Sequence, residues 1–277
     1  IKAASSRKKK YANWVFLSFF KTVLVLFLFV AVTGISMGIG MFRGILDSSP
    51  GFNPDSFAPS GYFSTIYNSA GEVTDTLVGS NANRIEASYE EFPQDLIDAF
   101  VAIEDARFWQ HNGIDFRSIT RAAVGVLTNN YSGGASTLTQ QLIKNNVFIN
   151  FMDEKTFYDR LERKIQEQFL AIEIEKQMSK DEILEAYMNT INLGQSCLGV
   201  QSAAERYFGK DVSELTLSES ALIAGITQSP SGYDPILHPE ANRGRREDVL
   251  DHMLDQDYIS QAAYDEAMAD TDAVYER

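Results

Sequence analysis

Residues 93–113 read PQDLIDAFVAIEDARFWQHNG, and much of the chain can be interpreted outward from this stretch. Pro93 suits the first position of a helix, where its missing N–H has no helical partner to lose. Four apolar residues then recur at helical spacing: Leu96, Ile97, Phe100 and Val101. The apolar face ends at two adjacent acids, Glu104 and Asp105. The stretch therefore predicts a core helix that carries a pair of carboxylates at its C-terminal end.

The residues that follow the two acids are unusual for a helix end. Arg107, Phe108 and His111 stand close behind them, whereas a solvated surface would alternate charges without aromatic side chains. A carboxylate among such neighbours is a candidate general base. The alternative is that Arg107 and His111 complement the macrodipole at the helix C-terminus. The spacing alone favours neither interpretation.

A second cluster lies at residues 133–145, GGASTLTQQLIKN. Two glycines followed by hydroxyl side chains present backbone N–H groups at a helix start, an arrangement that binds anions. Thr137, Gln141 and Lys144 share one face of that helix by their spacing. The alternative is structural, because Thr137 and Gln140 also fit a capping box.

A third cluster lies on a long helical segment from about residue 155 to 177 and comprises Arg160, Arg163, Lys164 and Glu167. Its cations could face a pyrophosphate while Glu167 adjusts the local charge. However, Arg163 and Glu167 are four residues apart, and an ion pair on the helix surface is the commoner occurrence. On composition alone, the surface ion pair is the better interpretation.

The rest of the body reads as mainly helical. Residues 62–67 and 73–78 are typical of two strands around a turn at 68–71, which predicts a hairpin. Capping boxes at 179–182 and 216–219 predict the starts of two further helices. We therefore expect a mostly α domain with a small β entry.

The N-terminal region predicts a membrane anchor. Residues 22–42 are 21 uncharged residues, and 14–20 extend them upstream. About 20 apolar residues span a bilayer core, and the apolar region of a cleavable signal peptide is shorter. The basic residues 7–10 precede this span, so the positive-inside rule places the N-terminus in the cytoplasm and the body outside.

Composition excludes several classes of function. The chain has 38 acidic and 24 basic residues and a net charge of −14, although residues 1–43 hold seven cations and no acid. A body this acidic argues against nucleic-acid binding, so an anionic substrate must meet a local cluster of cations. One cysteine, Cys197, and three histidines argue against a His/Cys zinc site. We assign no role to His238 and His252.

Taken together and in this order, the clusters resemble the glycosyltransferase domain of class A penicillin-binding proteins and monofunctional peptidoglycan glycosyltransferases, glycosyltransferase family 51. The likeness covers about residues 60–255 and rests on six segments: EDARFWQHNG (104–113), GGASTLTQQLIKN (133–145), RKIQE (163–167), KDEILEAYMNTINLG (180–194), GVQSAAERYFGK (199–210) and LTLSESALIAGITQSPSGYDP (215–235). The departures from the family pattern are Trp109 for a usual Tyr, Met188 for a usual Leu, and Cys197-Leu198 in a loop that often carries an aromatic residue. None of them replaces an Asp, Glu, Lys, Arg or His.

The resemblance implies a lysozyme-like lobe and a smaller membrane-proximal jaw lobe, preceded by the transmembrane helix and the hairpin. It implies lipid II and the growing lipid-linked glycan chain as substrates, met at the outer face of the cytoplasmic membrane. The expected organisation is a basic cytoplasmic tail (1–13), a span (14–42), a linker (43–61), the glycosyltransferase domain (62–258) and a helix with a linker (259–277) that could lead to a transpeptidase domain. Hydrophobic residues of the jaw could enter the outer leaflet: Phe148, Ile149, Phe151 and Met152.

The mechanism expected from this resemblance is an inverting glycosyl transfer. Glu104 removes the proton of the acceptor 4-hydroxyl, while Lys144, Arg163 and Lys164 stabilise the departing pyrophosphate and Glu167 lies near it. Further substrate-binding candidates are Ser136, Thr137, Gln140, Gln141, Asn145 and Arg160. The acceptor pocket is expected to be shaped by Asp105, Arg107, Phe108 and His111.

Other functions remain open at this level. A lytic transglycosylase or muramidase would share a key glutamate but needs no pyrophosphate site, and an inactive membrane-anchored scaffold needs neither. Mg2+ or Mn2+ could take part, although the sequence shows no dedicated ligand cage. Proteins of cell elongation or division could bind the cytoplasmic tail or the span.

Overall fold

The computed structural model describes residues 2–51, 64–71, 73–77, 83–128, 134–148, 151 and 154–270. It divides into two compact units, residues 1–49 and residues 50–277. The first unit is one continuous helix, α1 (Lys2–Asp47), of 46 residues. The helix runs five residues beyond the predicted span, because no proline interrupts the chain before Pro50.

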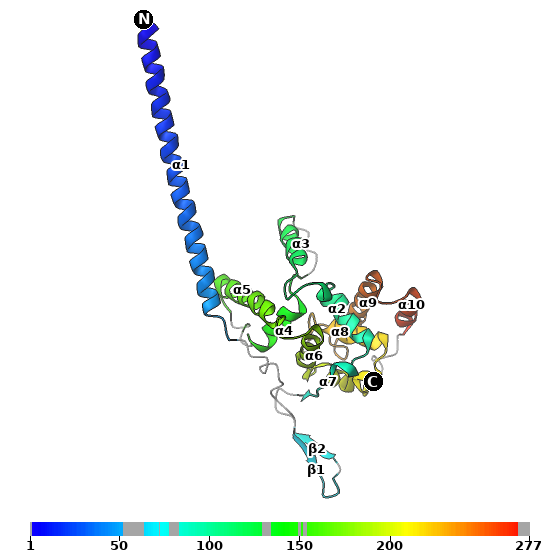
Figure 1. Cartoon of the computed structure of the whole chain (residues 1–277). Helices are drawn as coiled ribbons and strands as arrows, with labels where there is room; N and C mark the ends of the chain where they lie inside the picture. Colours follow the sequence, from blue (N-terminus) through cyan, green and yellow to red (C-terminus); the bar gives the residue numbers. More distant parts are fainter. Residues whose placement is uncertain are drawn as a thin grey trace. The chain divides into compact units, whose positions relative to one another are not determined.

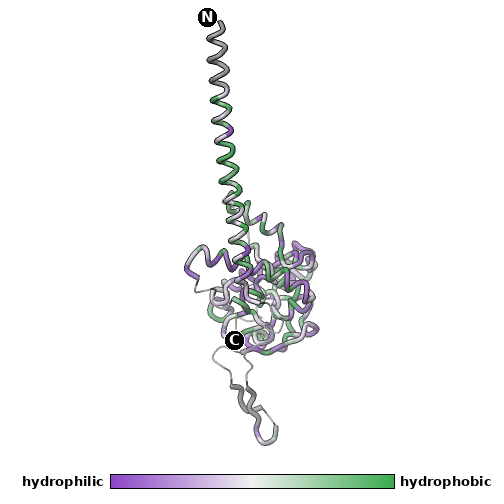
Figure 2. The backbone as a smooth tube through the Cα atoms, turned by 60° about the vertical axis from the view of Figure 1, so that its left-hand side comes forward, coloured by the Kyte–Doolittle hydropathy of each residue, from purple (hydrophilic) through white to green (hydrophobic). Residues whose placement is uncertain are grey.

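Helix α1 contains the apolar segment that the sequence predicts. Between Trp14 and Asp47 an 18-residue window reaches a mean hydropathy of 2.6, and Figure 2 shows this part of the helix coloured mostly as hydrophobic. Its side chains are exposed along most of this length. By length and composition this is one helix able to cross a membrane. The predicted N-terminal apolar helix is therefore confirmed.

The second unit begins with the predicted hairpin. Strand β1 (Ser64–Tyr67) pairs antiparallel with β2 (Val73–Leu77). The turn is stabilised by the side chain of Asn68, whose Oδ1 accepts from the amide of Ala70 at 2.9 Å. The predicted strand ends at residues 62, 63 and 78 lie outside the described residues.

The remainder of this unit is mostly helical (Figure 1). Its elements in chain order are β3 (Asn83–Arg84), η2 (Tyr89–Glu91), α2 (Gln94–Glu104), η3 (Phe108–Gln110), α3 (Phe116–Leu127), α4 (Leu138–Asn146), α5 (Phe157–Ile174), α6 (Lys180–Thr190), β4 (Cys197–Leu198), α7 (Val200–Phe208), η5 (Val212–Glu214), α8 (Leu217–Ile226), α9 (Pro239–Asp255) and α10 (Gln261–Ala269). The prediction of a mainly α fold with a small β entry is confirmed.

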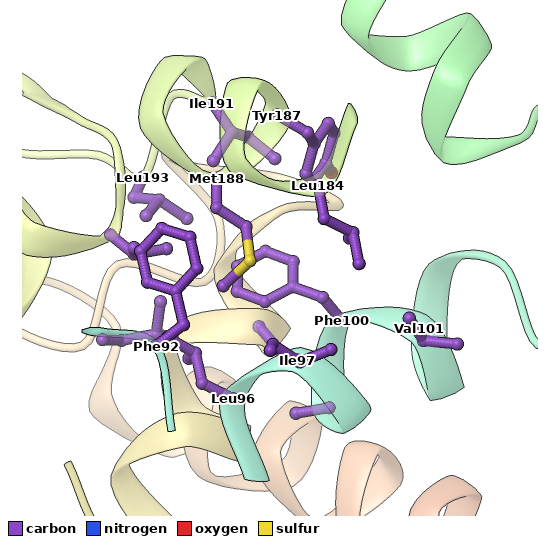
Figure 3. Packing of buried hydrophobic residues seen from close by; sticks show 14 of the residues in the cluster. Phe92, Leu96, Ile97, Phe100, Val101, Leu184, Tyr187, Met188, Ile191 and Leu193 are labelled. Atoms are coloured by element: carbon purple, nitrogen blue, oxygen red, sulfur yellow. The ribbon is translucent and has the colours of Figure 1, made fainter. Parts of the chain in front are cut away.

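Helix α2 is the central element of the body. It packs against α8 and α9, and its apolar face meets α6, where Phe100 and Tyr187 contact edge to face at 5.9 Å (Figure 3). Phe100 and Leu96 are completely buried, and burying a side chain of this size contributes about 1.5–3 kcal/mol. Helix α8 is buried from Ser218 to Ile226, as its nearly uniform small and apolar sequence favours. The C-terminal end of α2 is thereby held firmly in the body.

Two of the three predicted capping boxes are present. Ser179 and Glu182 cap α6 reciprocally, and Thr216 and Glu219 cap α8 in the same way. The third, at the start of α4, is only half formed: the side chain of Thr137 accepts from the amide of Gln140, but the Gln140 side chain is bound elsewhere.

Candidate active site

Glu104 is the last residue of α2, and its carboxylate is held by two other segments of the chain. Gln141 of α4 donates from Nε2 to Oε2 at 2.7 Å. Thr227, directly after α8, donates from Oγ1 to Oε1 at 2.5 Å. Donors on both oxygens fix the orientation of a carboxylate and leave each oxygen a further lone pair. Glu104 is partly exposed, so a ligand can reach it.

The amide of Gln141 is itself oriented by Tyr187. The Tyr187 hydroxyl donates to Gln141 Oε1 at 3.1 Å, which leaves Nε2 of the same amide for Glu104. Tyr187 is completely buried, and this burial raises its pKa well above the ordinary value, with the charges of Glu104 and Asp105 adding to the shift. The hydroxyl therefore stays protonated and remains a donor.

Asp105 points to a different environment from its neighbour. Its carboxylate accepts from the amide of Leu138 at 3.0 Å and lies 2.9 Å from Nε2 of His111. Asp105 is buried, and its hydrogen bond with the Leu138 amide connects the end of α2 to the start of α4. Asp105 also lines the cleft described below, so its place at an acceptor pocket stays a prediction, whereas His111 pairs with Asp105 and is not among the residues that line this cleft.

Arg107 and Phe108 mainly contact other side chains of the domain and so have structural roles. Arg107 donates to Asp115 Oδ2 at 2.5 Å and to Ser118 Oγ at 3.1 Å. Burial alone would raise the pKa of Asp115, but hydrogen bonds from Ser118 and Arg107 outweigh it and lower the pKa to about 2. Phe108 is completely buried, with the Lys180 ammonium 4.2 Å from its ring centroid. Phe108 therefore cannot form the wall of a pocket, whereas part of Arg107 still can.

Thr137 and Gln140 face the interior. Thr137 Oγ1 donates to the carbonyl of Gly113 at 2.8 Å, and Gln140 Nε2 donates to the same carbonyl at 3.3 Å. Gly113 has a φ of +84°, and a Cβ on it would lie 2.5 Å from the carbonyl oxygen of Ala171 in α5. Both side chains hold this close approach of backbone to backbone, which is a structural role, and their contact with substrate stays a prediction. The structural interpretation of this pair is the better one.

The cations of α5 surround a buried acid. Glu167 has no exposed surface, and Arg163 Nη1 donates to its Oε1 while Lys164 Nζ donates to its Oε2 at 2.6 Å. Lys164 also donates to Ser136 Oγ at 3.2 Å, and Arg163 donates from Nε to Glu154 at 2.6 Å. The expected surface ion pair is therefore wrong: Glu167 is enclosed, and it holds two cations in fixed positions.

Lys144 faces the same region from α4. Within the part of the chain that the structure describes, its ammonium makes no hydrogen bond or ion pair, and it lies 4.7 Å from the ring centroid of Phe151. Burial lowers its pKa, the positive charge of Lys164 lowers it further, and Glu167 opposes these effects. A partly buried cation without a counterion among the described residues, beside two further cations, is an anion-binding arrangement.

The remaining candidates lie around this cluster. Asn145 is partly exposed next to Lys144, and Arg160 is exposed on α5 and makes none of the contacts above. The ring of Phe151 lies against Lys144 and Arg163, and Phe148 packs partly against the core. Their entry into the outer leaflet stays a prediction. Ile149, Met152 and Gly133 lie outside the described residues.

A cleft of about 660 Å³ passes Glu104 and Ser136. It is also lined by the predicted Thr137 and by five residues that we did not predict: Arg121, Gln228, Arg245, His252 and Gln256. Arg245 and His252 lie on α9 and Gln256 directly follows it, and their spacing of i, i+7 and i+11 places them on one side of that helix. The spacing of these residues can be read from the sequence. It does not predict a cleft, because the residues on the opposite side of the cleft come from other elements.

The site offers no obvious metal position. Among the described residues, no group of three His, Cys, Asp or Glu side chains could hold a metal ion. The acids nearest to the cation cluster, Glu154 and Glu167, are already paired with Arg163 and Lys164. We therefore derive no step through a divalent ion.

Known proteins resemble this chain over the same region. A family model described as Transglycosylase matches residues 70–254. Penicillin-binding protein 1A of Clostridium botulinum (strain Langeland) is 40% identical over 278 residues, which cover 96% of this chain and 32% of the relative. Penicillin-binding protein 1A of Vibrio cholerae is 48% identical over 188 residues, covering 68% of this chain and 22% of the relative.

A solved structure is similar as well. The crystal structure of penicillin-binding protein 1A from Haemophilus influenzae is 28% identical with a TM-score of 0.44, and the match covers 76% of this chain and 21% of that chain. The chain thus spans only about a third of the length of the first curated relative.

Proposed function

Because the chain belongs to the transglycosylase family, we propose that it is a peptidoglycan glycosyltransferase that polymerises lipid II into glycan strands. The observation that carries this proposal is the pairing of an oriented carboxylate, Glu104, with a cation cluster in which Lys144 has no counterion among the described residues. Transfer of a sugar from a lipid pyrophosphate needs a base for the acceptor hydroxyl and positive charge at the leaving group.

In the proposed reaction, Glu104 accepts the proton of the 4-hydroxyl of the acceptor GlcNAc. The freed oxygen attacks C1 of the donor MurNAc at the end of the growing chain. The bond from C1 to the lipid pyrophosphate breaks, and the configuration at C1 is inverted. Glu104 suits this role because its oxygens keep lone pairs that the donors Gln141 and Thr227 do not use.

The departing pyrophosphate would be stabilised by Lys144, Arg163 and Lys164. Glu167 is a positioning residue in this scheme, since it fixes Arg163 and Lys164 before the charge develops. Ser136 and Asn145 remain candidates for contacts to the phosphates or the sugar. Gln141, expected to bind substrate, would act instead through Glu104.

The acceptor would occupy the cleft that runs past Glu104. Its volume of about 660 Å³ lies within the usual range for small-molecule sites. Arg107, the α9 residues Arg245 and His252, and Gln256 offer it polar groups. Asp105, which was expected to shape the acceptor pocket, also lines this cleft, whereas Phe108 and His111 are not among its lining residues.

Lipid II carries a long isoprenoid, so a glycosyltransferase must meet it at a membrane surface. We infer that α1 anchors the chain in the cytoplasmic membrane, with the N-terminus inside because residues 7–10 are basic. The domain proposed from the sequence, residues 62–258, contains the family match at 70–254. Proteins of cell elongation or division remain proposed partners of the tail or the span.

The direct test is to give the detergent-solubilised chain lipid II and, separately, finished peptidoglycan. Glycan strands formed from lipid II would support the proposal. Release of anhydro or reducing sugars from finished peptidoglycan, without polymerisation, would favour a lytic enzyme, for which the cation cluster has no use. Activity on neither substrate would favour a scaffold.

A further inference from the structure

We propose that Thr227 is a positioning residue for Glu104 and that its hydroxyl serves both protonation states of this carboxyl. The inference rests on the proposed function and gives a role to a residue that lies in the segment 215–235 but was assigned none from the sequence. Thr227 is the residue that ends α8, and 123 positions separate it from Glu104. Its Oγ1 lies 2.5 Å from Glu104 Oε1 and 2.8 Å from the carbonyl oxygen of Ala224.

The two neighbours of this hydroxyl compete for one proton. A hydroxyl has a single O–H donor and two acceptor lone pairs, and it can rotate toward either partner. The Ala224 carbonyl lies in the last turn of α8, where carbonyls lack regular helical partners. Its contact from the Thr227 amide is long, at 3.4 Å. Both Glu104 and Ala224 can therefore accept from the same hydroxyl.

The charge on Glu104 decides which of them does. While Glu104 is ionised, the hydroxyl donates to Oε1 in a charge-assisted hydrogen bond. When Glu104 has accepted the acceptor's proton, Oε1 can carry that proton and needs an acceptor. The Thr227 hydroxyl then turns to the Ala224 carbonyl, and its oxygen accepts from Oε1. One O–H bond breaks at the substrate and one forms at Glu104, so no other proton donor is required.

Gln141 cannot adapt in this way. Its Nε2 only donates, and its Oε1 already accepts from Tyr187 at 3.1 Å, so turning the amide would break that bond. A proton placed on Glu104 Oε2 toward Gln141 would face an N–H group that cannot accept it, so this position is unfavourable for the new proton. The geometry assigns Oε1, on the Thr227 side, as the oxygen that holds it.

The test compares Thr227→Val, which keeps the shape and removes the hydroxyl, with Thr227→Ser, which keeps the hydroxyl. For polymerisation of lipid II by the full chain, we expect kcat of Thr227→Val to fall about 10-fold to 100-fold, because a hydrogen bond to a charged group is lost. KM for lipid II and the affinity for a lipid pyrophosphate should stay within about twofold of wild type. Thr227→Ser should restore most of kcat.

Thr128→Val is a matched control. Thr128 ends α3 as Thr227 ends α8, and its hydroxyl donates to the Val124 carbonyl at 2.8 Å without contact to Glu104. This variant should polymerise lipid II like the wild type.

Two results would overturn the inference alone: wild-type kcat in Thr227→Val, or equal losses in Thr227→Val and Thr227→Ser, which would indicate packing. A wild-type chain that forms no strands would overturn the proposed function, and this inference with it.

Discussion

At the scale of residues, two neighbouring acids have different surroundings because the helix ends between them. Glu104 is the last residue of α2, whereas Asp105 has the non-helical angles φ −155° and ψ 71°. This turn sends Asp105 to the start of α4, where His111 and the Leu138 amide satisfy it. The sequence predicts a carboxylate pair here. It could not predict which one stays accessible, because the partners come from distant segments.

Lys144 gives a prediction about pH. Burial and the charges of Lys164 and Arg163 lower its pKa, so it loses its charge at a lower pH than an ordinary lysine. The ammonium is charged below that pKa and neutral above it, so affinity for a lipid pyrophosphate should fall as the pH rises through it. Lys144→Arg should retain affinity to higher pH, because a guanidinium stays charged.

The measurement is the Kd of a lipid pyrophosphate for wild type, Lys144→Arg and Lys144→Ala between about pH 7 and pH 10. Lys144→Ala should bind weakly throughout this range. An unchanged Kd in Lys144→Ala would contradict the assignment of Lys144 to the leaving-group site.

At the scale of elements, the start of α4 depends on a glycine 25 positions before it. The carbonyl of Gly113 accepts from both Thr137 and Gln140, and α5 passes so close that no Cβ fits. The capping pattern of Thr137 and Gln140 could be read from the sequence, but the second half of the box is replaced by this long-range contact. Similarly, the spacing of Arg163 and Glu167 is local, whereas the burial of Glu167 is set by packing between α4 and α5.

Gly113→Ala should therefore be strongly destabilising. A positive φ and a contact of 2.5 Å to backbone together predict a loss of about 2–5 kcal/mol in the free energy of unfolding. Gly134→Ala is the matched control, because a Cβ there meets nothing within 4 Å. Chemical denaturation followed by circular dichroism would measure both. Equal stability of the two variants would show that the approach of α5 to Gly113 is not as close as described.

Much of the fold could be predicted from local patterns, but less of the site. The hairpin, the capping boxes at 179–182 and 216–219, and the apolar N-terminal helix each follow from spacing or composition within one segment. Thr227, by contrast, meets Glu104 only because α8 packs on α2. Its sequence neighbours carry no sign of that role.

At the scale of the whole molecule, a long apolar helix and an acidic body that holds the cations Lys144, Arg163 and Lys164 together suit a lipid-linked anionic substrate. If α1 serves to keep the body at the membrane, a chain that begins at residue 50 should polymerise lipid II in vesicles at least about 10-fold more slowly than the full chain. With a water-soluble short-chain analogue of lipid II, the two should be equally fast. Equal losses with both substrates would indicate instead that the truncation damages the body, which circular dichroism would check.

The central claim is that Glu104 is the base of a lipid II polymerase, and Glu104→Gln tests it most directly. This change keeps the size of the side chain and removes its ability to accept a proton. We predict that strand formation, followed on gels under single-turnover conditions, falls at least about 100-fold, while the Kd for a lipid pyrophosphate stays within about threefold of wild type. Strands formed by Glu104→Gln at close to the wild-type rate would contradict the account.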